Sequence, residues 1–224
     1  MSTVNQLTHG ISERLRITEI FFSLQGESRT VGWPTAFVRL TGCPLRCGYC
    51  DTPYAFEGGR WMALADIIDE VAAMRPRFVT VTGGEPLAQK PCQHLMSSLC
   101  DAGYEVSLET SGAMDVADVD PRVSIVLDVK TPGSGEESKN RYQNLARLAA
   151  KDQVKFVICD HTDYEWAREK LDTHLRDTPC EVLFSPEHEG MNATELADWI
   201  LADRLPVRMQ IQLHKYLWGN DRGR

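Results

Sequence analysis

The 224-residue chain lacks long apolar runs and has no excess of positive charge. Its longest apolar stretches, such as Ser124–Leu127, fall far short of the roughly 20 residues that a membrane helix needs. Lysine and arginine number 24 against 32 acidic residues, so the net charge of −8 disfavours binding to long anionic nucleic acid. The polar segment Met1–Ile11 lacks the hydrophobic region of a secretory signal. These absences favour a soluble cytoplasmic protein that engages neither membrane nor nucleic acid.

The chain also lacks internal repeats, low-complexity tracts and long linkers. Its 16 glycines and 11 prolines are close to ordinary usage, which excludes a collagen-like or disordered polymer. A chain of this length fits one large domain or two small ones. We interpret residues 1–224 as a single domain, of which residues 1–13 form a flexible N-terminal extension.

A disulfide framework is also missing, since the seven cysteines are odd in number and no secretory signal precedes them. Four of them are scattered, and each is expected to be a small buried apolar side chain. These are Cys92, Cys100, Cys159 and Cys180. The other three, Cys43, Cys47 and Cys50, lie within eight residues and indicate a metal or redox site.

What is present is a regular alternation of strand and helix patterns, typical of βαβ units with a mainly parallel sheet. The spacings Thr162…Glu165 and Asn192…Glu195 predict helix starts. We therefore expect an α/β fold with a parallel sheet or partial barrel. Strands are predicted at 15–20, 35–41, 77–82, 104–109, 123–129, 154–159, 181–184 and 207–213, and helices near 64–71, 89–101, 140–150, 163–175 and 193–202.

Polar and glycine-rich segments follow four consecutive parallel strands. They are Gly42–Thr52, Gly83–Pro86, Glu109–Gly112 and Asp128–Lys130. The active sites of parallel α/β proteins lie at the carboxyl ends of the strands. We therefore expect these segments to converge at one rim of the sheet and to form the active site.

The three clustered cysteines are too few for a structural zinc site, which usually takes four ligands. The next histidine along the chain, His94, follows Cys50 by 44 residues. A cubane iron–sulfur cluster is ordinarily held by four thiolates, so three leave one iron open to a small molecule. The spacing C-x3-C-x2-C, with Tyr49 before the third cysteine and Gly83–Pro86 downstream, resembles the radical S-adenosylmethionine (SAM) superfamily.

This resemblance implies a partial β/α barrel in which Cys43, Cys47 and Cys50 hold a 4Fe–4S cluster. Gly83–Pro86 would meet the methionine end of SAM, which binds the open iron. Reductive cleavage of SAM then yields a 5′-deoxyadenosyl radical, so the cofactor carries the hard chemistry and no protein residue is assigned a catalytic role.

Four further segments point to one family within this superfamily. The resemblance to that family runs from about Thr18 to Leu217. Leu24-Gln-Gly-Glu27, Phe37-Val-Arg39, Cys50-Asp-Thr52 and His214-Lys-Tyr216 together resemble the 7-carboxy-7-deazaguanine synthases. The resemblance implies a carbon–nitrogen lyase of 7-deazapurine (queuosine) biosynthesis. Its substrate would be 6-carboxy-5,6,7,8-tetrahydropterin, which loses a hydrogen from C6, contracts its ring and releases ammonia while SAM is regenerated.

The same resemblance assigns binding residues. Arg39 would pair with the substrate carboxylate, and Thr52 would bind Mg2+, which accepts hydroxyl oxygens. Substrate binding is assigned to Leu24, Gln25, Gly26, Glu27, Arg39, Thr82 and His214. SAM binding is assigned to Tyr49, Cys50, Asp51, Gly84, Glu85, Ser111, Asp128, Val129, Lys130, Ser185 and Pro186.

Purely structural or rival roles of several residues stay open at this point. Arg39 fits a structural ion pair, Thr52 fits a turn hydroxyl that bonds local backbone, Asp51 rivals Thr52 as the Mg2+ ligand, and His214 fits simple packing. The segment Lys130-Thr-Pro-Gly-Ser-Gly135 preserves the family pattern only loosely. No role is assigned to the tail after Leu217.

Alternative functions also stay open. A glycyl-radical-activating enzyme shares the cysteine spacing but does not require Leu24–Glu27 or Arg39. Another small-molecule radical SAM enzyme and an iron–sulfur electron carrier are the remaining options. The resemblance further implies a homodimer and a flavodoxin or ferredoxin as electron donor.

Overall fold

The computed structural model describes residues 13–224, in which one nine-stranded sheet forms the centre of the molecule. The strand order is β3-β1-β2-β4-β5-β6-β7-β8-β9, and no pairing joins the edge strands β3 and β9 within this part of the chain. The strands are β1 (Arg14–Leu24), β2 (Pro34–Leu40), β3 (Arg60–Ala63), β4 (Phe78–Gly83), β5 (Glu105–Thr110), β6 (Ser124–Asp128), β7 (Gln153–Ile158), β8 (Glu181–Pro186) and β9 (Arg208–Met209).

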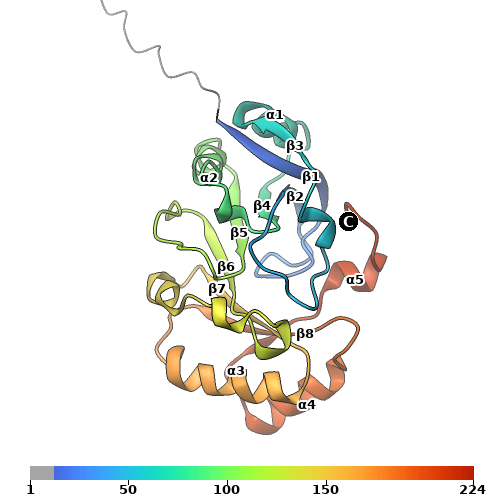
Figure 1. Cartoon of the computed structure of the whole chain (residues 1–224), viewed down its shortest axis with the longest axis vertical. Coiled ribbons are helices and arrows are strands. Elements are labelled where there is room, and N and C mark those ends of the chain that lie inside the picture. The colour runs from blue at the N-terminus through green and yellow to red at the C-terminus, as the bar shows by residue number, and fades with distance from the viewer. Residues whose placement is uncertain (1–12) are drawn as a thin grey trace, which may run out of the picture.

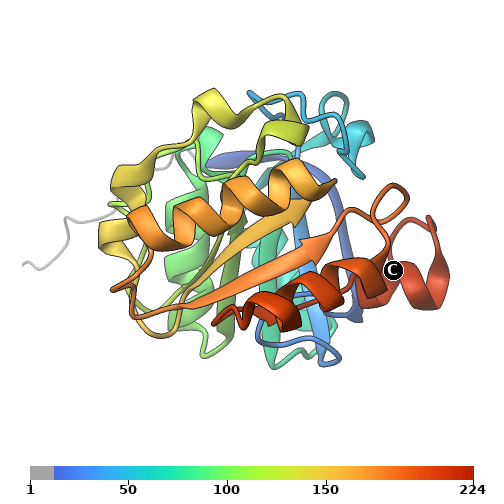
Figure 2. The same cartoon turned by 90° about the horizontal axis from the view of Figure 1, so that it is seen from below.

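The sheet is parallel from β2 to β9, and only β1 pairs antiparallel, with β2 and β3. Figure 1 shows the sheet curving around an interior, with the helices on its outer side. In Figure 2, α3 and α4 flank the strands near the C-terminal edge. The helices are α1 (Leu64–Ala73), α2 (Cys92–Asp101), α3 (His161–His174), α4 (Ala193–Asp203) and α5 (Leu213–Trp218). The prediction of an open, mainly parallel partial barrel is confirmed.

Alternation along the strands separates an apolar face from a polar one. In β4, Val79 and Val81 belong to the hydrophobic core, whereas Thr80 and Thr82 alternate with them. The Thr80 hydroxyl bonds the hydroxyl of Ser107 in β5 at 2.8 Å. Because successive strand residues point to opposite faces, the apolar set packs under the helices and the polar set faces the interior. This polar interior is where a ligand cavity can form.

Two helix starts differ in how well they match their predictions. Asn192 accepts bonds from the backbone amides of Thr194 and Glu195, which confirms the predicted start of α4. The start of α3 was predicted at Thr162 but lies at His161, because the Asp160 carboxylate accepts the Asp163 amide at 2.9 Å. A carboxylate at this position satisfies an otherwise unpaired first-turn amide.

Two predicted elements take other forms. The helix predicted at 140–150 is a 3-10 segment, Tyr142–Arg147, because the buried Asn144 side chain bonds the carbonyls of Gly112 and Met114 instead. The strand predicted at 207–213 is limited to β9, and the chain then turns into α5, so His214 lies on a helix. The short strand β3 was not predicted. None of the helices described is long and apolar enough to span a bilayer.

Of the predicted N-terminal extension, only Glu13 is described, and its carbonyl accepts the amide of Leu64 at 3.1 Å. The remainder of that prediction, and the single-domain boundary at residue 1, lie outside the described residues.

Candidate active site

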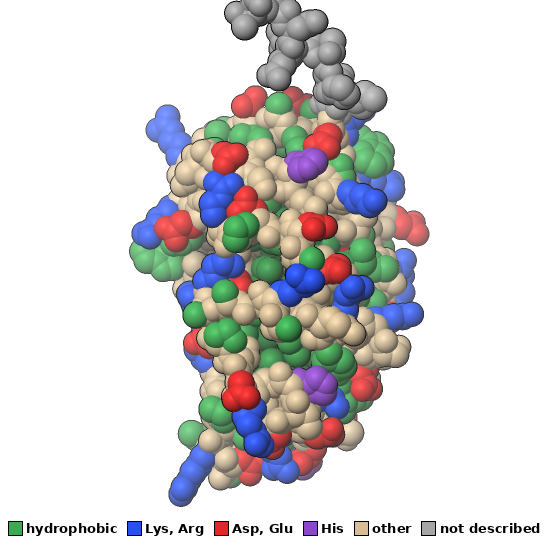
Figure 3. Space-filling view, turned by 90° about the vertical axis from the view of Figure 1, so that its left-hand side faces the viewer, with side chains coloured by type: hydrophobic (Ala, Val, Ile, Leu, Met, Phe, Trp, Pro, Cys, Tyr) green, Lys and Arg blue, Asp and Glu red, His purple; other side chains and the backbone are tan. Residues whose placement is uncertain are grey.

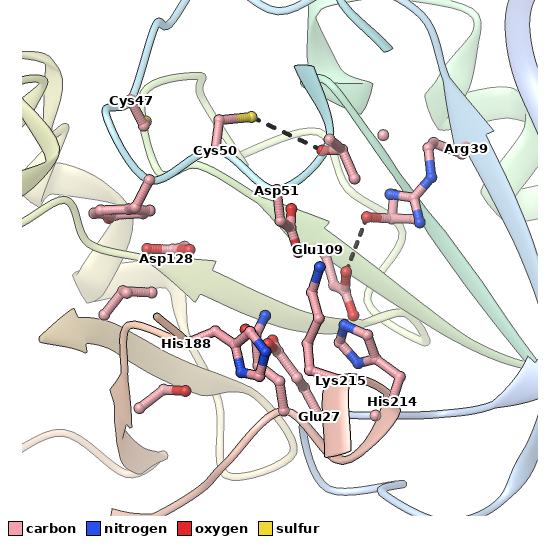
Figure 4. Close-up of a pocket in the computed structure, with 18 of the residues that line it drawn as sticks. Glu27, Arg39, Cys47, Cys50, Asp51, Glu109, Asp128, His188, His214 and Lys215 are labelled. Atoms are coloured by element: carbon pink, nitrogen blue, oxygen red, sulfur yellow. Dashed lines mark hydrogen bonds between the residues drawn. The ribbon is translucent and has the colours of Figure 1, made fainter. Parts of the chain in front are cut away.

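A cavity of about 650 Å³ opens at the carboxyl ends of the parallel strands. The four polar segments predicted to converge do so, since residues of each line it (Figure 4). Of the predicted cluster, Mg2+, SAM and substrate residues, all but two contribute to its wall. The lining residues from those predictions are Leu24, Gln25, Gly26, Glu27, Arg39, Cys43, Cys47, Tyr49, Cys50, Asp51, Thr52, Thr82, Gly84, Ser111, Asp128, Lys130, Ser185, Pro186 and His214.

The two predicted residues outside the wall are Glu85 and Val129, and both are buried. The Glu85 carboxylate accepts bonds from the Thr110 hydroxyl, from the amide and hydroxyl of Ser111, and from the amide of Leu87. Its oxygens are therefore occupied within the protein. Glu85 ties the end of β4 to the end of β5, and any contact it makes with SAM would come through backbone.

The cysteine loop follows β2 directly and is held against the end of β4. The Gly84 amide bonds the Leu40 carbonyl at 3.1 Å, and the Glu85 amide bonds the Gly42 carbonyl at 2.8 Å. A Cβ at Gly84 would overlap the carbonyl of Gly42, so glycine is required for this close approach. The Gly83–Pro86 turn and the cysteine loop thus form one rigid corner of the cavity.

All three clustered thiols are free and partly exposed at this corner. Burial and nearby negative charges raise the pKa of Cys43 and Cys47, although Lys130 opposes the shift. A bound cation is needed to hold such thiols as thiolates, because metal binding displaces the thiol protons.

Within residues 13–224, no three His, Cys, Asp or Glu side chains are arranged around a single metal ion. Each thiolate of a cubane cluster binds a different iron, so three free thiols on one loop can hold three irons and leave the fourth open. The donor set therefore fits a three-cysteine 4Fe–4S site.

Beside the cysteine loop, two buried polar atoms lack a hydrogen-bond partner among the described residues. They are the hydroxyl of Tyr49 and Oδ1 of Asp128. Buried polar groups are normally paired, so unpaired ones in a cavity wall indicate that a ligand completes them. The Lys130 ammonium lies 5.5 Å from the centroid of the Tyr49 ring and 3.1 Å from Asp128 Oδ2. This end of the wall suits a polar, charged cofactor such as SAM.

Lys155 and Glu109 line the cavity near Glu27. Sequence reasoning missed Lys155, whereas it placed Glu109 at the rim of the active site without a role of its own. Lys155 Nζ lies 2.7 Å from Glu27 Oε2 and 3.5 Å from Asp128 Oδ2. Although burial opposes ionisation of Glu27, Lys155 lowers its pKa to about 2. Burial and the neighbouring Glu27 raise the pKa of Glu109, whose carboxylate accepts the Thr82 hydroxyl at 2.8 Å. The position of Glu109 next to the end of β5 was a signal that it lies at the active site. The sequence gives no such signal for Lys155.

Arg39 lies on the opposite part of the wall and is already paired. Its Nε donates to Glu19 Oε1 at 2.7 Å, and the Tyr54 hydroxyl donates to the same oxygen at 2.9 Å. The ion pair that was considered as an alternative role therefore exists. Arg39 nevertheless lines the cavity, beside the stacked rings of Phe21 and Phe37, whose centroids are 4.8 Å apart.

His214 reaches the cavity from α5, opposite the loop that follows β1. The amide of Leu213 bonds the carbonyl of Gly26 at 3.0 Å, which places the imidazole against Gly26. Burial lowers the pKa of His214, while the charge of Glu27 opposes that shift. Figure 4 shows His214 and Glu27 on the same side of the cavity, away from Cys47 and Cys50.

Thr52 ends the cysteine loop, and its hydroxyl does not bond local backbone. It makes no capping bond to the following 3-10 turn, and its side-chain partner within residues 13–224 is Cys50 Sγ at 3.9 Å. The turn-hydroxyl interpretation therefore loses its support. The hydroxyl oxygen lines the cavity beside Asp51, where a hard cation with several waters would fit.

Comparison with known proteins agrees with this geometry. A model of the radical SAM superfamily matches residues 37–128. The 7-carboxy-7-deazaguanine synthase of Chlorobaculum tepidum is 46% identical over 92% of this chain and 96% of its own length. The 7-carboxy-7-deazaguanine synthase of Koribacter versatilis is 43% identical over 91% of this chain and 97% of its own length. The crystal structure of QueE from Escherichia coli matches with a TM-score of 0.74 and 26% identity, covering 90% of this chain and 95% of that one. The chain belongs to the 7-carboxy-7-deazaguanine synthase family of radical SAM enzymes.

Proposed function

We propose that this enzyme converts 6-carboxy-5,6,7,8-tetrahydropterin to 7-carboxy-7-deazaguanine with release of ammonia. One observation carries the proposal: a single cavity joins a wall of three free thiols to a wall that bears Arg39. The proposed SAM-cleaving centre and an anion-binding group thus share one cavity. A glycyl-radical-activating enzyme, which must admit a protein segment, has no need of this arrangement.

Cys43, Cys47 and Cys50 would hold the 4Fe–4S cluster. When bound, the cluster and SAM supply the organic radical that abstracts a hydrogen atom from the substrate. The unpaired Tyr49 hydroxyl and Asp128 Oδ1 support SAM binding on the adjacent wall. The remaining residues proposed to bind SAM are Cys50, Asp51, Gly84, Glu85, Ser111, Val129, Lys130, Ser185 and Pro186.

The substrate side combines one cation with an acidic and polar edge. Arg39 keeps its terminal nitrogens for the substrate carboxylate, because Glu19 accepts from Nε. Glu27, ionised through its pairing with Lys155, would accept from the amino-pyrimidine edge of the pterin. Backbone groups of Leu24–Gly26 would complete that edge, with Thr82 and His214 as further contacts. Thr52 would bind Mg2+, which would orient the substrate.

We further propose a cytoplasmic homodimer that receives electrons from a flavodoxin or ferredoxin. Exposed aromatic side chains support an assembly surface, since Trp33, Trp61 and Phe22 are each about half exposed. Positive and negative side chains are interspersed on the face in Figure 3, which favours protein or small-molecule partners over nucleic acid.

A product assay tests the proposal. The protein is reconstituted anaerobically with iron and sulfide, then mixed with SAM, Mg2+, a reductant and the carboxytetrahydropterin. We expect 7-carboxy-7-deazaguanine and ammonia in equal amounts, with SAM not consumed. Cleavage of SAM to 5′-deoxyadenosine with no deazaguanine product would instead favour another radical SAM reaction. Absence of both would favour an electron carrier.

A further inference from the structure

The segment Gly219–Arg224, which follows α5, lies along the mouth of the cavity. The guanidinium of Arg222 lies over the ring of Tyr54, with Cζ 4.1 Å from the ring centroid. Gly223 lies beside Phe21, so the backbone of the segment is held at the same place. Figure 1 shows this end of the chain next to β1. The segment therefore forms part of the cavity wall.

Arg222 belongs to the same group of side chains as Arg39. The Tyr54 hydroxyl donates to Glu19 Oε1, the oxygen that also accepts from Arg39 Nε. The Cζ of Arg39 lies 5.7 Å from the centroid of the Phe21 ring. Tyr54 and Phe21 thus each contact the C-terminal segment and lie in the same group of side chains as Arg39 and Glu19.

The two guanidinium groups differ in how their charge is balanced. Glu19 pairs with Arg39 at 2.7 Å, and only 15% of the Arg39 side chain is exposed. No hydrogen bond or ion pair is recorded for the Arg222 guanidinium within residues 13–224, where its contact is the Tyr54 ring. A guanidinium held on an aromatic ring keeps its donors free and in a fixed plane, which suits a carboxylate. Arg222 therefore brings a second guanidinium to this edge of the cavity, which Asp51 and Asp221 also line.

We propose that Arg222 is a second binding residue for the substrate carboxylate, beside Arg39, and that it sets the preference for a carboxylated pterin. The inference rests on the proposed function, which supplies the anionic group. Arg39 is paired with Glu19 through Nε, which leaves its terminal nitrogens for the carboxylate. Arg222 would add a second set of guanidinium donors to the same group.

Binding to the reconstituted enzyme with SAM, without reductant so that no turnover occurs, tests the proposal by calorimetry. The two ligands are 6-carboxytetrahydropterin and 6-methyltetrahydropterin, which lacks the carboxylate. We expect Arg222→Gln to weaken binding of the first by about 10- to 100-fold, the range of a charge-assisted hydrogen bond, and that of the second by less than about twofold. Arg222→Lys, which keeps the charge without the planar fork, should fall between. Arg176→Gln is the matched control, because Arg176 forms an exposed pair with Asp172 and does not line the cavity.

Equal weakening of both ligands would overturn the proposal and make Arg222 a cover for the pterin ring. Unchanged binding of the carboxylated ligand would also overturn it. The retained affinity for the methyl ligand shows that the variant is folded. A wild-type enzyme with no preference for the carboxylated pterin would overturn the proposed substrate itself, whereas a preference that survives Arg222→Gln would remove only this inference.

Discussion

The imidazole of His214 packs so closely on Gly26 that a Cβ at position 26 would overlap its Nδ1 and Cγ. The two residues are far apart in the sequence, and the bond from the Leu213 amide to the Gly26 carbonyl fixes their approach. The glycine of the Leu24–Glu27 segment is thus required by a side chain of α5. It makes room for the histidine at the edge of the substrate cavity.

Gly26→Ala should therefore displace His214 and raise the KM for the pterin, and lower the free energy of unfolding by about 1–3 kcal/mol. Uncoupled SAM cleavage should change little, since the cysteine loop is separate. The double variant Gly26→Ala/His214→Ala supplies the control, because the added methyl then meets no ring. We expect it to recover most of the stability lost by Gly26→Ala alone. Additive losses in the two variants would contradict the packing explanation.

Cys47→Ala should lose iron and all SAM cleavage, because a site with three thiolates has none to spare. Iron and sulfide analysis after anaerobic reconstitution measures this directly. Cys92→Ala is the comparison, since Cys92 is fully buried under the sheet within the hydrophobic core. It should keep its iron content and lose only stability. A wild-type iron content in Cys47→Ala would refute the cluster assignment.

Arg39→Ala should weaken binding of the carboxylated pterin by on the order of 2–5 kcal/mol, since it removes the guanidinium proposed to pair with the substrate carboxylate and leaves Glu19 without its counter-ion. SAM cleavage without substrate should survive. Glu19→Gln keeps an acceptor for Arg39 Nε and for the Tyr54 hydroxyl, so its effect should be smaller. Parallel loss of substrate binding and SAM cleavage in Arg39→Ala would indicate a folding role instead.

Thr52→Ala should lose most of the stimulation of product formation by Mg2+, whereas Thr52→Ser should retain more because it keeps the oxygen. Basal SAM cleavage should be indifferent to Mg2+ in every variant. Asp51→Asn, measured in parallel, tests whether Asp51 is the Mg2+ ligand instead of Thr52. If chelation of Mg2+ leaves wild-type turnover unchanged, neither residue has a metal to bind.

Because of the Glu27–Lys155 pair, the free energy of unfolding of the apoprotein should decrease at low pH. Because Lys155 lowers the pKa of Glu27 from 4.5 to about 2, the stabilisation is complete above about pH 4.5. It is lost as the pH falls from about 4.5 towards 2, where the unfolded chain binds a proton first. Chemical denaturation across this range should show a smaller pH slope in Glu27→Gln than in the wild type. Equal slopes would mean that the carboxylate is not ionised against Lys155.

The fold and the cysteine site could be predicted from the sequence because both depend on local patterns. Strand alternation, strand-end position and the C-x3-C-x2-C spacing are readable within short windows. The structure confirms the fold, and the family confirms the 4Fe–4S cluster and SAM as cofactors. The assignments of individual SAM, substrate and Mg2+ residues stay predictions.

What could not be predicted depends on distant contacts. The helix predicted at 140–150 fails because buried Asn144 bonds backbone some 30 residues away. A strand was expected up to residue 213, directly before His214, but the segment after β9 bonds the loop after β1 rather than extending the sheet. Lys155 gives no signal in a strand that otherwise looks apolar, since its partners Glu27 and Asp128 come from other elements. Pairing across the cavity is invisible to a local pattern.

The bonds between the loop after β1 and the segment around β9 also bear on the order in which the enzyme folds. The Ser28 amide bonds the Gln210 side chain, and the Ser28 carbonyl accepts from Arg208, across 182 and 180 residues of sequence. Contacts between such distant segments close the longest loops and so form late. The bonds of the cysteine loop close shorter loops, since the Arg46 amide bonds the Glu136 side chain across 90 residues. The chain can therefore assemble its cluster-binding half before the half that holds the pterin exists, which would let a nascent enzyme acquire iron before it can bind substrate.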